Sequence, residues 1–188
     1  LAMFYLDFLD QLAPEQGFDV VGHSIGGWLA AEIAVRNSRH VRSLTLMASA
    51  GLRVPGTSMG DVFIWNDEET ARHLVFDPAM RAARLAAQPS DEEADILVRN
   101  KFSFAKLAWH PRLFNPDLQK WLHRIQVPTQ VIWGDHDGLF PLAYAQHWHQ
   151  QLPGSGLHIV PDCGHSPLNE KPAETAALIH AFMARDAA

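Results

Sequence analysis

A serine set between glycines is the feature of this sequence most able to do chemistry. The string Gly22-His23-Ser24-Ile25-Gly26 follows a short apolar run, Phe18 to Val21, and precedes an alanine-rich segment. This order predicts a strand, a tight turn with Ser24 at its tip, and a helix. We expect the glycines at positions 22 and 26 to leave room for the crowded backbone of the turn. The backbone N–H of Ile25 would then lie at the positive end of the helix, where it could bind an oxyanion.

A nucleophilic serine needs a histidine base, and the base needs a carboxylate that fixes its tautomer. We assign the base to His165, because it follows a predicted strand in a tight loop bounded by glycine and proline. His23 stands beside the serine and points away from it along the chain, and most of the other histidines lie in segments typical of surfaces. His147 and His149 are two residues apart on a predicted helix, which argues against a metal pair.

We assign the acid to Asp137. Asp135 and Asp137 both follow the third predicted strand, but Asp137 lies deeper in the loop and precedes Gly138, which would let the chain turn the carboxylate toward the base. Asp135 would brace the loop instead. Asp162 is interpreted as a turn residue, because two acidic roles in one short loop would be unusual. Cys163 is interpreted as a small buried filler and not as a second nucleophile.

Strands and helices in alternation must position these residues. The predicted strands span residues 18–21, 41–48, 127–133 and 157–160. The predicted helices around them span residues 1–16, closed by Pro14 and Gly17, then 28 to about 38, 141–148 and 172–185. Strands joined by helices form right-handed parallel units, and a ligand crevice lies at the C-terminal ends of such strands, where Ser24 would sit.

Residues 52–124 have a different character, because strand-like runs disappear and short helical segments follow one another. The predicted helices span 68–75, 78–87, 91–107 and 117–124, with prolines at the breaks. This insertion begins just after a strand end on the side of Ser24, so it is placed to act as a lid. Its aromatic side chains could line a substrate pocket or could equally pack the lid helices together; they are Phe63, Trp65, Phe102, Phe104, Trp109 and Phe114.

The composition excludes several classes of protein. A chain of 188 residues with 47% hydrophobic content can bury a core, which excludes disorder and small disulfide scaffolds. The formal charge of −6 predicts no basic face for nucleic acid or anionic lipid. A single cysteine fits a reducing compartment, and no apolar run is long enough to cross a bilayer. We therefore expect a cytoplasmic protein that binds neither nucleic acid nor membrane.

The chain resembles the α/β-hydrolase superfamily, and more narrowly its lid-bearing bacterial esterase-like members. The resemblance covers nearly the whole chain and rests on Gly22-His23-Ser24-Ile25-Gly26-Gly27, on Trp133-Gly134-Asp135-His136-Asp137 with Pro141, and on Asp162-Cys163-Gly164-His165. It implies Ser24 as nucleophile, Asp137 as acid, His165 as base and the N–H of Ile25 as an oxyanion donor. We expect no metal and no cofactor.

The resemblance also implies an α/β fold, the C-terminal portion of an α/β-hydrolase with about four parallel strands flanked by helices. Residues 1–51 and 126–188 would form the hydrolase core, and residues 52–125 an all-helical lid. We expect His23, Trp65 and Phe140 to contribute to substrate binding.

The front of the chain departs from the family pattern. Family members have several strands before the first helix found here, including one whose His-Gly loop supplies a second oxyanion donor. This chain instead opens at Leu1 on a helical pattern, which suggests a fragment. We expect the natural protein to be longer by roughly 80 residues. If the chain folds as given, we expect a homo-oligomer that covers the open edge of the strand ending at Ser24, and a stable monomer in sedimentation would contradict this.

Hydrolysis of a small carboxylic ester through an acyl-enzyme on Ser24 is the function that we expect. A carbon–carbon bond hydrolase with the same triad is an alternative, although such family members tend to have Asn where this chain has His23. Cofactor-free perhydrolysis and an inactive, truncated fragment or binding module are further alternatives. The lid aromatics indicate an apolar substrate portion, but the sequence does not identify the substrate.

Overall fold

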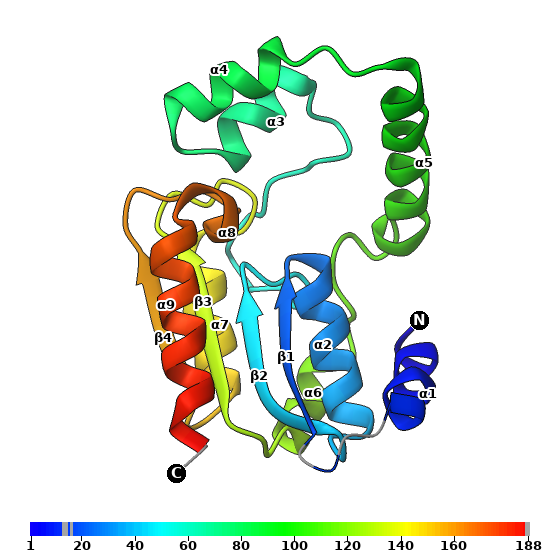
Figure 1. Cartoon of the computed structure of the whole chain (residues 1–188), viewed down its shortest axis with the longest axis vertical. Helices are drawn as coiled ribbons and strands as arrows, with labels where there is room; N and C mark the ends of the chain where they lie inside the picture. Colours follow the sequence, from blue (N-terminus) through cyan, green and yellow to red (C-terminus); the bar gives the residue numbers. More distant parts are fainter. Residues whose placement is uncertain (13–14, 16, 187–188) are drawn as a thin grey trace.

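The architecture is a parallel sheet with helices on both faces and a helical insertion above one end (Figure 1). This computed structural model describes residues 1–12, 15 and 17–186. Its strands are β1 (Phe18–His23), β2 (Val41–Met47), β3 (Thr129–Gly134) and β4 (Gly156–Val160). Its helices are α1 (Ala2–Leu12), α2 (Ile25–Arg36), α3 (Asp67–Leu74), α4 (Pro78–Ala86), α5 (Asp91–Ala108), α6 (Leu118–Trp121), α7 (Leu142–Gln151), α8 (Pro167–Glu170) and α9 (Pro172–Met183), with 3-10 turns η1 (Leu122–Arg124) and η2 (Ala184–Asp186).

The four strands are parallel and lie in the order β1-β2-β3-β4, so each pairs with its neighbour in the sequence. Gly22 lies opposite Leu46, and Gly134 lies opposite Val160. The expected four-stranded parallel sheet is therefore confirmed. β1 is an edge strand of the described sheet, as expected for the strand that ends at Ser24. The homo-oligomer that would cover this edge stays a prediction.

Two apolar clusters hold the helices on the sheet. The larger cluster lies between the sheet and the helices α2 and α7, and the smaller one lies under α9 on the opposite face (Figure 1). Small side chains let α2 approach the sheet closely, because Ala30, Ala31 and Ala34 are all buried there. On the other face, Leu178 and Ile179 of α9 pack against the smaller cluster. The layers therefore fix both faces of the strands whose ends carry the predicted site.

The insertion between β2 and β3 rises above the C-terminal ends of the strands (Figure 1). Its two ends meet in a parallel bridge between Gly51 and Phe114, in which the N–H of Gly51 donates to the carbonyl of Leu113 at 2.8 Å. Asn66 and Ser90 begin α3 and α5 with capping boxes, which explains why these helices start where the sequence predicts within a residue. The insertion therefore leaves and re-enters the core at one point. Its role as a lid stays a prediction.

Several helix bounds differ from those predicted. The first helix ends at Leu12, and Pro14, which was expected to close it, lies outside the described residues. The segment predicted as one helix over 117–124 divides into α6 and η1. The short helix α8 was not predicted, because a single turn carries no hydrophobic periodicity. The last helix ends at Met183 and continues as the 3-10 turn η2.

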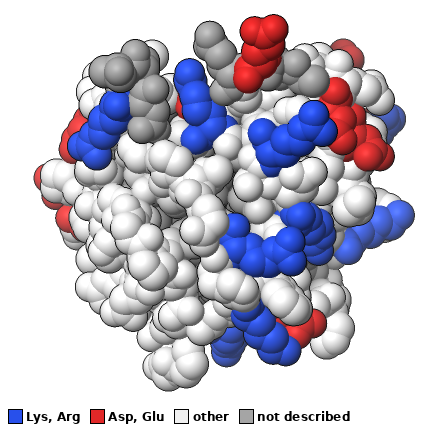
Figure 2. Space-filling model, turned by 90° about the horizontal axis from the view of Figure 1, so that it is seen from below, with Lys and Arg blue, Asp and Glu red and all other residues white. Residues whose placement is uncertain are grey.

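Charged side chains are scattered over the end of the molecule where the strands begin. Figure 2 shows Lys and Arg at several places on this face, with Asp and Glu among them and wide uncharged areas between. This view shows no continuous basic face, in keeping with the formal charge of −6. In the part of the chain that the structure describes, no helix is both long and apolar enough to cross a bilayer.

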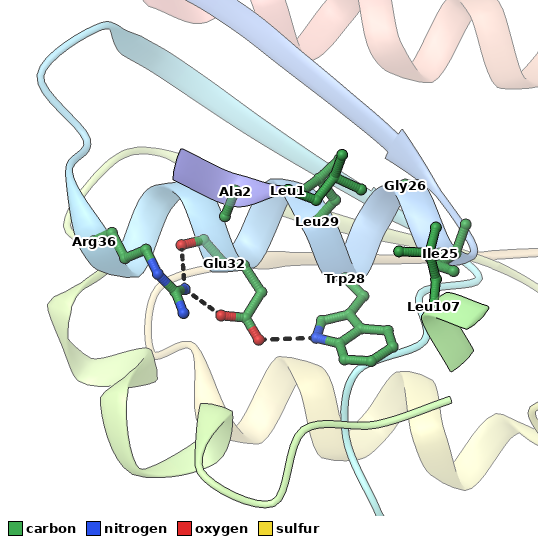
Figure 3. A pocket seen from close by; sticks show the side chains of 9 residues that line it. All are labelled: Leu1, Ala2, Ile25, Gly26, Trp28, Leu29, Glu32, Arg36 and Leu107. Carbon is green, nitrogen blue, oxygen red and sulfur yellow. Dashed lines mark hydrogen bonds and ion pairs between the residues drawn. The ribbon is translucent and has the colours of Figure 1, made fainter. Parts of the chain in front are cut away.

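Glu32 joins α2 to the last part of the insertion. Its carboxylate accepts a hydrogen bond from Trp28 Nε1 (2.9 Å) and pairs with the guanidinium of Arg36 (Figure 3). It also accepts a hydrogen bond from Asn115 Nδ2 (2.8 Å). Burial raises the pKa of this carboxyl, but the hydrogen bonds from Asn115, Arg36 and Trp28 outweigh burial and hold the pKa below its usual value. Glu32 is therefore ionised, and it stabilises the fold most when it is charged.

Replacing Glu32 by alanine should lower the free energy of unfolding by about 1–3 kcal/mol, because the donors of Trp28 and Asn115 would lose their acceptor. Since the folded pKa is lowered, the contribution of Glu32 is present above its unfolded pKa of about 4.3 and is lost as the pH falls through the folded value. Urea unfolding at a series of pH values measures both effects. The exposed Glu15→Ala is the matched control, and equal loss in both variants would contradict the prediction.

Candidate active site

Ser24 lies at a strained turn between β1 and α2. Its backbone has φ 55° and ψ −118°, a left-handed conformation that non-glycine residues rarely adopt. Main-chain hydrogen bonds hold the turn, since Ser24 N–H donates to Met47 O (2.8 Å) and Ser24 O accepts from Gly27 N–H (3.0 Å) and Ala50 N–H (3.0 Å). The strand–turn–helix context expected for the glycine-flanked serine is therefore present.

The close packing of this turn requires glycine at positions that differ in part from those expected. A Cβ added at Gly22 would collide with the main chain of Gly26, which confirms the need for glycine at position 22. A Cβ at Gly26 would meet nothing within 4 Å among the described residues, so the expectation for position 26 is wrong. Gly27 is the second crowded position, because a Cβ there would lie 2.5 Å from Ser49 Oγ.

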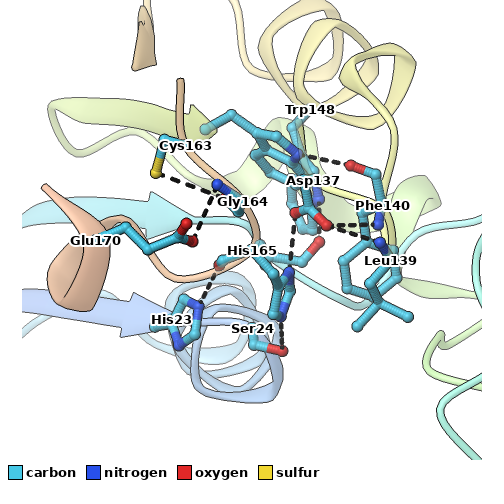
Figure 4. Close-up of polar contacts among 12 residues, drawn as sticks. His23, Ser24, Asp137, Leu139, Phe140, Trp148, Cys163, Gly164, His165 and Glu170 are labelled. Atoms are coloured by element: carbon cyan, nitrogen blue, oxygen red, sulfur yellow. Dashed lines mark hydrogen bonds and ion pairs between the residues drawn. The ribbon is translucent and has the colours of Figure 1, made fainter. Parts of the chain in front are cut away.

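Three polar side chains from separate parts of the chain form one hydrogen-bonded row (Figure 4). His165 Nε2 lies 2.9 Å from Ser24 Oγ, and His165 Nδ1 lies 2.8 Å from Asp137 Oδ2. His165 and Asp137 are only 4% and 5% exposed. The structure therefore brings together the three residues that the sequence singles out. An imidazole in such a row can take the proton of a serine hydroxyl while the carboxylate stabilises the resulting charge.

Main-chain donors orient the Asp137 carboxylate. Its Oδ1 accepts from the N–H groups of Leu139 (2.9 Å) and Phe140 (3.0 Å), which leaves Oδ2 directed at His165 (Figure 4). Asp135 instead accepts from the N–H of Cys163 at 3.1 Å, as expected for a residue that braces the loop. The contacts thus distinguish the two aspartates, because only Asp137 reaches His165.

The neighbours of His165 include two of the three residues expected to bind substrate. His23 Nε2 donates to the carbonyl of His165 at 2.8 Å, and the two rings are 5.0 Å apart. Burial lowers the pKa of His23, and the nearby charge of His165 lowers it further. The ring of Phe140 lies 5.7 Å from that of His165. Both side chains therefore touch the histidine, and their expected contact with a substrate stays a prediction.

Trp65 and Cys163 make contacts of their own. The Trp65 ring stacks on His73 with centroids 4.5 Å apart and fills the space beside Gly60, so it packs within the insertion. Its expected part in substrate binding is a prediction. Cys163 is buried, and burial together with the charge of Glu170 raises the pKa of its thiol to about 12. A thiol that stays protonated is a poor nucleophile, which agrees with the role of filler.

A mostly apolar cavity of about 270 Å³ lies beside the first turns of α2 (Figure 3). Its walls come from α1, α2 and the end of α5, and include Ile25, Trp28 and Leu107. It borders the helix that follows Ser24 but is lined by none of the three residues of the hydrogen-bonded row. Among residues 1–12, 15 and 17–186, no group of three or more His, Cys, Asp or Glu side chains could hold a metal ion.

The crowding at Gly27 and the open space at Gly26 give a matched pair of substitutions. Gly27→Ala should destabilise the chain by roughly 1–3 kcal/mol, because the new methyl group overlaps Ser49. Gly26→Ala should be neutral or should stabilise by up to about 1 kcal/mol, because alanine favours helix. Thermal and urea unfolding measure the stability of the two variants against that of the parent chain. A larger loss for Gly26→Ala than for Gly27→Ala would contradict the geometry of the turn.

Known proteins share this sequence pattern and fold. The sequence profile of the Alpha/beta hydrolase family matches residues 2–178. The chain is 31% identical to 2-hydroxymuconate semialdehyde hydrolase of Pseudomonas putida, over 94% of this chain and 65% of that protein. It is 28% identical to monoacylglycerol lipase ABHD6 of Mus musculus, over 89% of this chain and 55% of that protein.

Among solved structures, a serine hydrolase involved in carbazole degradation, the CarC enzyme, superposes with a TM-score of 0.68. The sequence identity is 25%, and the match covers 97% of this chain and 69% of that one. The chain thus spans between about half and two thirds of the length of the proteins that it matches. The family profile covers nearly all of its residues, and the chain belongs to the alpha/beta hydrolase family.

Proposed function

We propose that this chain carries the nucleophile, base and acid of a serine hydrolase that cleaves small carboxylic esters. The observation that supports the proposal is the position of His165, whose two ring nitrogens lie within 3 Å of Ser24 Oγ and Asp137 Oδ2. The two relatives described above are named a hydrolase and a lipase, which supports the reaction class. The ester substrate and the activity of the chain are part of the proposal.

Catalysis would proceed through an acyl-enzyme. His165 Nε2 takes the proton of Ser24 as Oγ attacks the ester carbonyl, and the imidazolium is stabilised by Asp137 at Nδ1. The tetrahedral intermediate collapses, and the alcohol leaves with the proton from His165. A water molecule then gives a proton to the same nitrogen and attacks the acyl group. The acid is released, and Ser24 regains its proton.

The backbone N–H of Ile25 would stabilise the oxyanion of both intermediates. Ile25 is the first residue of α2, where helix geometry leaves the N–H without an intrahelical acceptor. The helix dipole adds positive potential at the same point. An oxyanion donor contributes on the order of 10²- to 10³-fold in rate, so a second donor would raise turnover by a similar factor.

The insertion would cover the site as a lid and supply apolar surface for the substrate. Within it, Phe63 stacks on Phe104 with ring centroids 5.1 Å apart and meets Trp109 edge-to-face at 5.2 Å. Arg112 lies over Phe63 and Trp109 and pairs with Asp61, which ties together the two ends of the insertion. An apolar acyl or alcohol portion fits this aromatic surface better than a charged one.

A second candidate reaction is hydrolysis of a ring-fission product at a carbon–carbon bond. The relative from Pseudomonas putida named 2-hydroxymuconate semialdehyde hydrolase supports it, because this chain is 31% identical to it. The same nucleophile, base and acid would serve. We favour the ester because carbon–carbon hydrolases of the family tend to have Asn where this chain has His23.

A fluorophosphonate probe tests whether Ser24 is an activated nucleophile. We expect the parent chain to be labelled at Ser24 and the label to disappear in Ser24→Ala. Asp137→Asn should slow labelling by at least about 10³-fold, because the carboxylate no longer fixes the imidazole tautomer. Ser103→Ala, at an exposed position in α5, should label like the parent. Absence of label in a folded parent chain, or label that persists in Ser24→Ala, would refute the proposal.

A substrate pair separates the two candidate reactions. We expect p-nitrophenyl butyrate to be hydrolysed with a kcat/KM at least about tenfold above that for 2-hydroxymuconate semialdehyde, because a good leaving group demands less of the acid–base pair. Both rates should fall by at least about 10³-fold in Ser24→Ala. The reverse order of kcat/KM would favour the carbon–carbon hydrolase.

A further inference from the structure

The end of α3 and its link to α4, residues 73–77 of the insertion, lie against the loops that carry the acid and the base. Gly138 N–H, next to Asp137 in the chain, donates to His73 O at 3.0 Å. His165 N–H donates to Leu74 O at 2.8 Å. The insertion therefore contacts the hydrogen-bonded row through its main chain, independently of any substrate.

The approach of this segment is so close that it needs glycine on the core side. A Cβ at Gly138 would lie 2.5 Å from His73 O. A Cβ at Gly164 would lie 2.5 Å from Leu74 O and 2.9 Å from Phe76 N. Real Cβ atoms essentially never come within 3.0 Å of such atoms. Gly138 and Gly164 thus leave the space that the main chain of residues 73–77 occupies.

One side chain, Glu170, joins the segment to the base loop. Its Oε2 accepts from Phe76 N–H (2.7 Å) and Asp77 N–H (3.2 Å), and its Oε1 accepts from Gly164 N–H (3.0 Å). Figure 4 shows the carboxylate directed at Gly164, beside the loop that leads to His165. Hydrogen bonds to an ionised acceptor are roughly twice as strong as neutral ones. The residue therefore links the insertion to the position immediately before the base.

Glu170 is held in place by its own element. It ends α8, which begins at the buried Pro167, and Thr175 Oγ1 donates to Pro167 O at 2.9 Å. Helix α4 does not need the Glu170 carboxylate as its cap, because Asp77 Oδ1 already accepts from Ala79 N–H and Met80 N–H. The three contacts of Glu170 therefore serve to connect the insertion to the loop that carries His165.

We infer that Glu170 is a positioning residue that ties the insertion to the loop of His165 and so holds the imidazole in line with Ser24. Without the carboxylate, Gly164 N–H and the two N–H groups of the insertion lose their common acceptor. The base loop then keeps only its main-chain contact with Leu74 on this side. The consequence for catalysis rests on the proposed function.

The test compares Glu170→Ala with Glu174→Ala, an exposed glutamate in the first turn of α9. Hydrogen exchange is followed by mass spectrometry in peptides that contain residues 73–78 and 162–166. We expect roughly ten- to hundredfold faster exchange in both peptides for Glu170→Ala, because hydrogen bonds to a charged group are lost. We expect no change for Glu174→Ala.

The second readout is the far-downfield proton NMR signal of the hydrogen bond between His165 Nδ1 and Asp137. We expect this signal to weaken or disappear in Glu170→Ala at a temperature where the variant is folded. An unchanged signal would overturn the inference even if exchange becomes faster, because Glu170 would then stabilise the fold without positioning the base. Unchanged exchange in both peptides would also overturn it.

Glu170→Gln keeps the inference testable if Glu170→Ala does not fold. The amide of glutamine has one acceptor oxygen, so it can satisfy either Gly164 or the two N–H groups of the insertion, but not both. We expect a weakened His165 signal in this variant, and a signal identical to that of the parent would overturn the inference. Neither readout depends on turnover, so a Ser24 that fails to react with the fluorophosphonate would refute the proposed function alone.

Discussion

The hydrogen bond between Asp137 and His165 requires two loops to meet at one end of the sheet, and their main chains bring them together. The loops follow the neighbouring strands β3 and β4, and Asp135 N–H donates to the last carbonyl of β4 at 3.1 Å. Glycine at position 134 makes the approach possible, because a Cβ there would collide with the carbonyl of Gly164. The spacing of Asp137 and His165 is therefore set by backbone contacts before either side chain is considered.

Ser24 joins this pair through β2, which lies between β1 and β3. Ser24 donates its N–H to Met47 at the end of β2, and Ala50 just beyond returns a hydrogen bond to Ser24. The strained φ of Ser24 persists because the surrounding main chain leaves it no alternative. A slip of one residue in any strand pair would move a loop by about 3.3 Å and reverse the faces of the strand. A contact of 2.9 Å between Ser24 Oγ and His165 Nε2 therefore depends on the register of the whole sheet.

The sequence predicted the sheet, the turn and the three residues that the structure brings together, because each depends on local signals. Apolar runs mark the strands, and polar residues beside glycine mark their ends. Ligand sites of parallel sheets lie at these C-terminal ends. The sequence did not separate Gly26 from Gly27, since only the contact with Ser49 shows which one is crowded. Nor did it indicate Glu170, whose partners are main-chain N–H groups of Phe76, Asp77 and Gly164. Backbone donors have no sequence signature, so contacts of this kind appear only once the chain is folded.

The insertion contacts the loops of Asp137 and His165 mainly through its main chain, and this affects which side chains of the insertion can be substituted. His73 and Leu74 offer carbonyls to Gly138 and His165, contacts that do not depend on which side chains stand at those two positions. The long helix α5, by contrast, presents exposed apolar side chains and lies to one side of α3 and α4 (Figure 1). If the proposed function holds, substitutions on α5 would change the surface offered to a substrate without moving His165. A fixed acid–base geometry beneath a variable helical surface is a physical route by which one fold can serve many substrates.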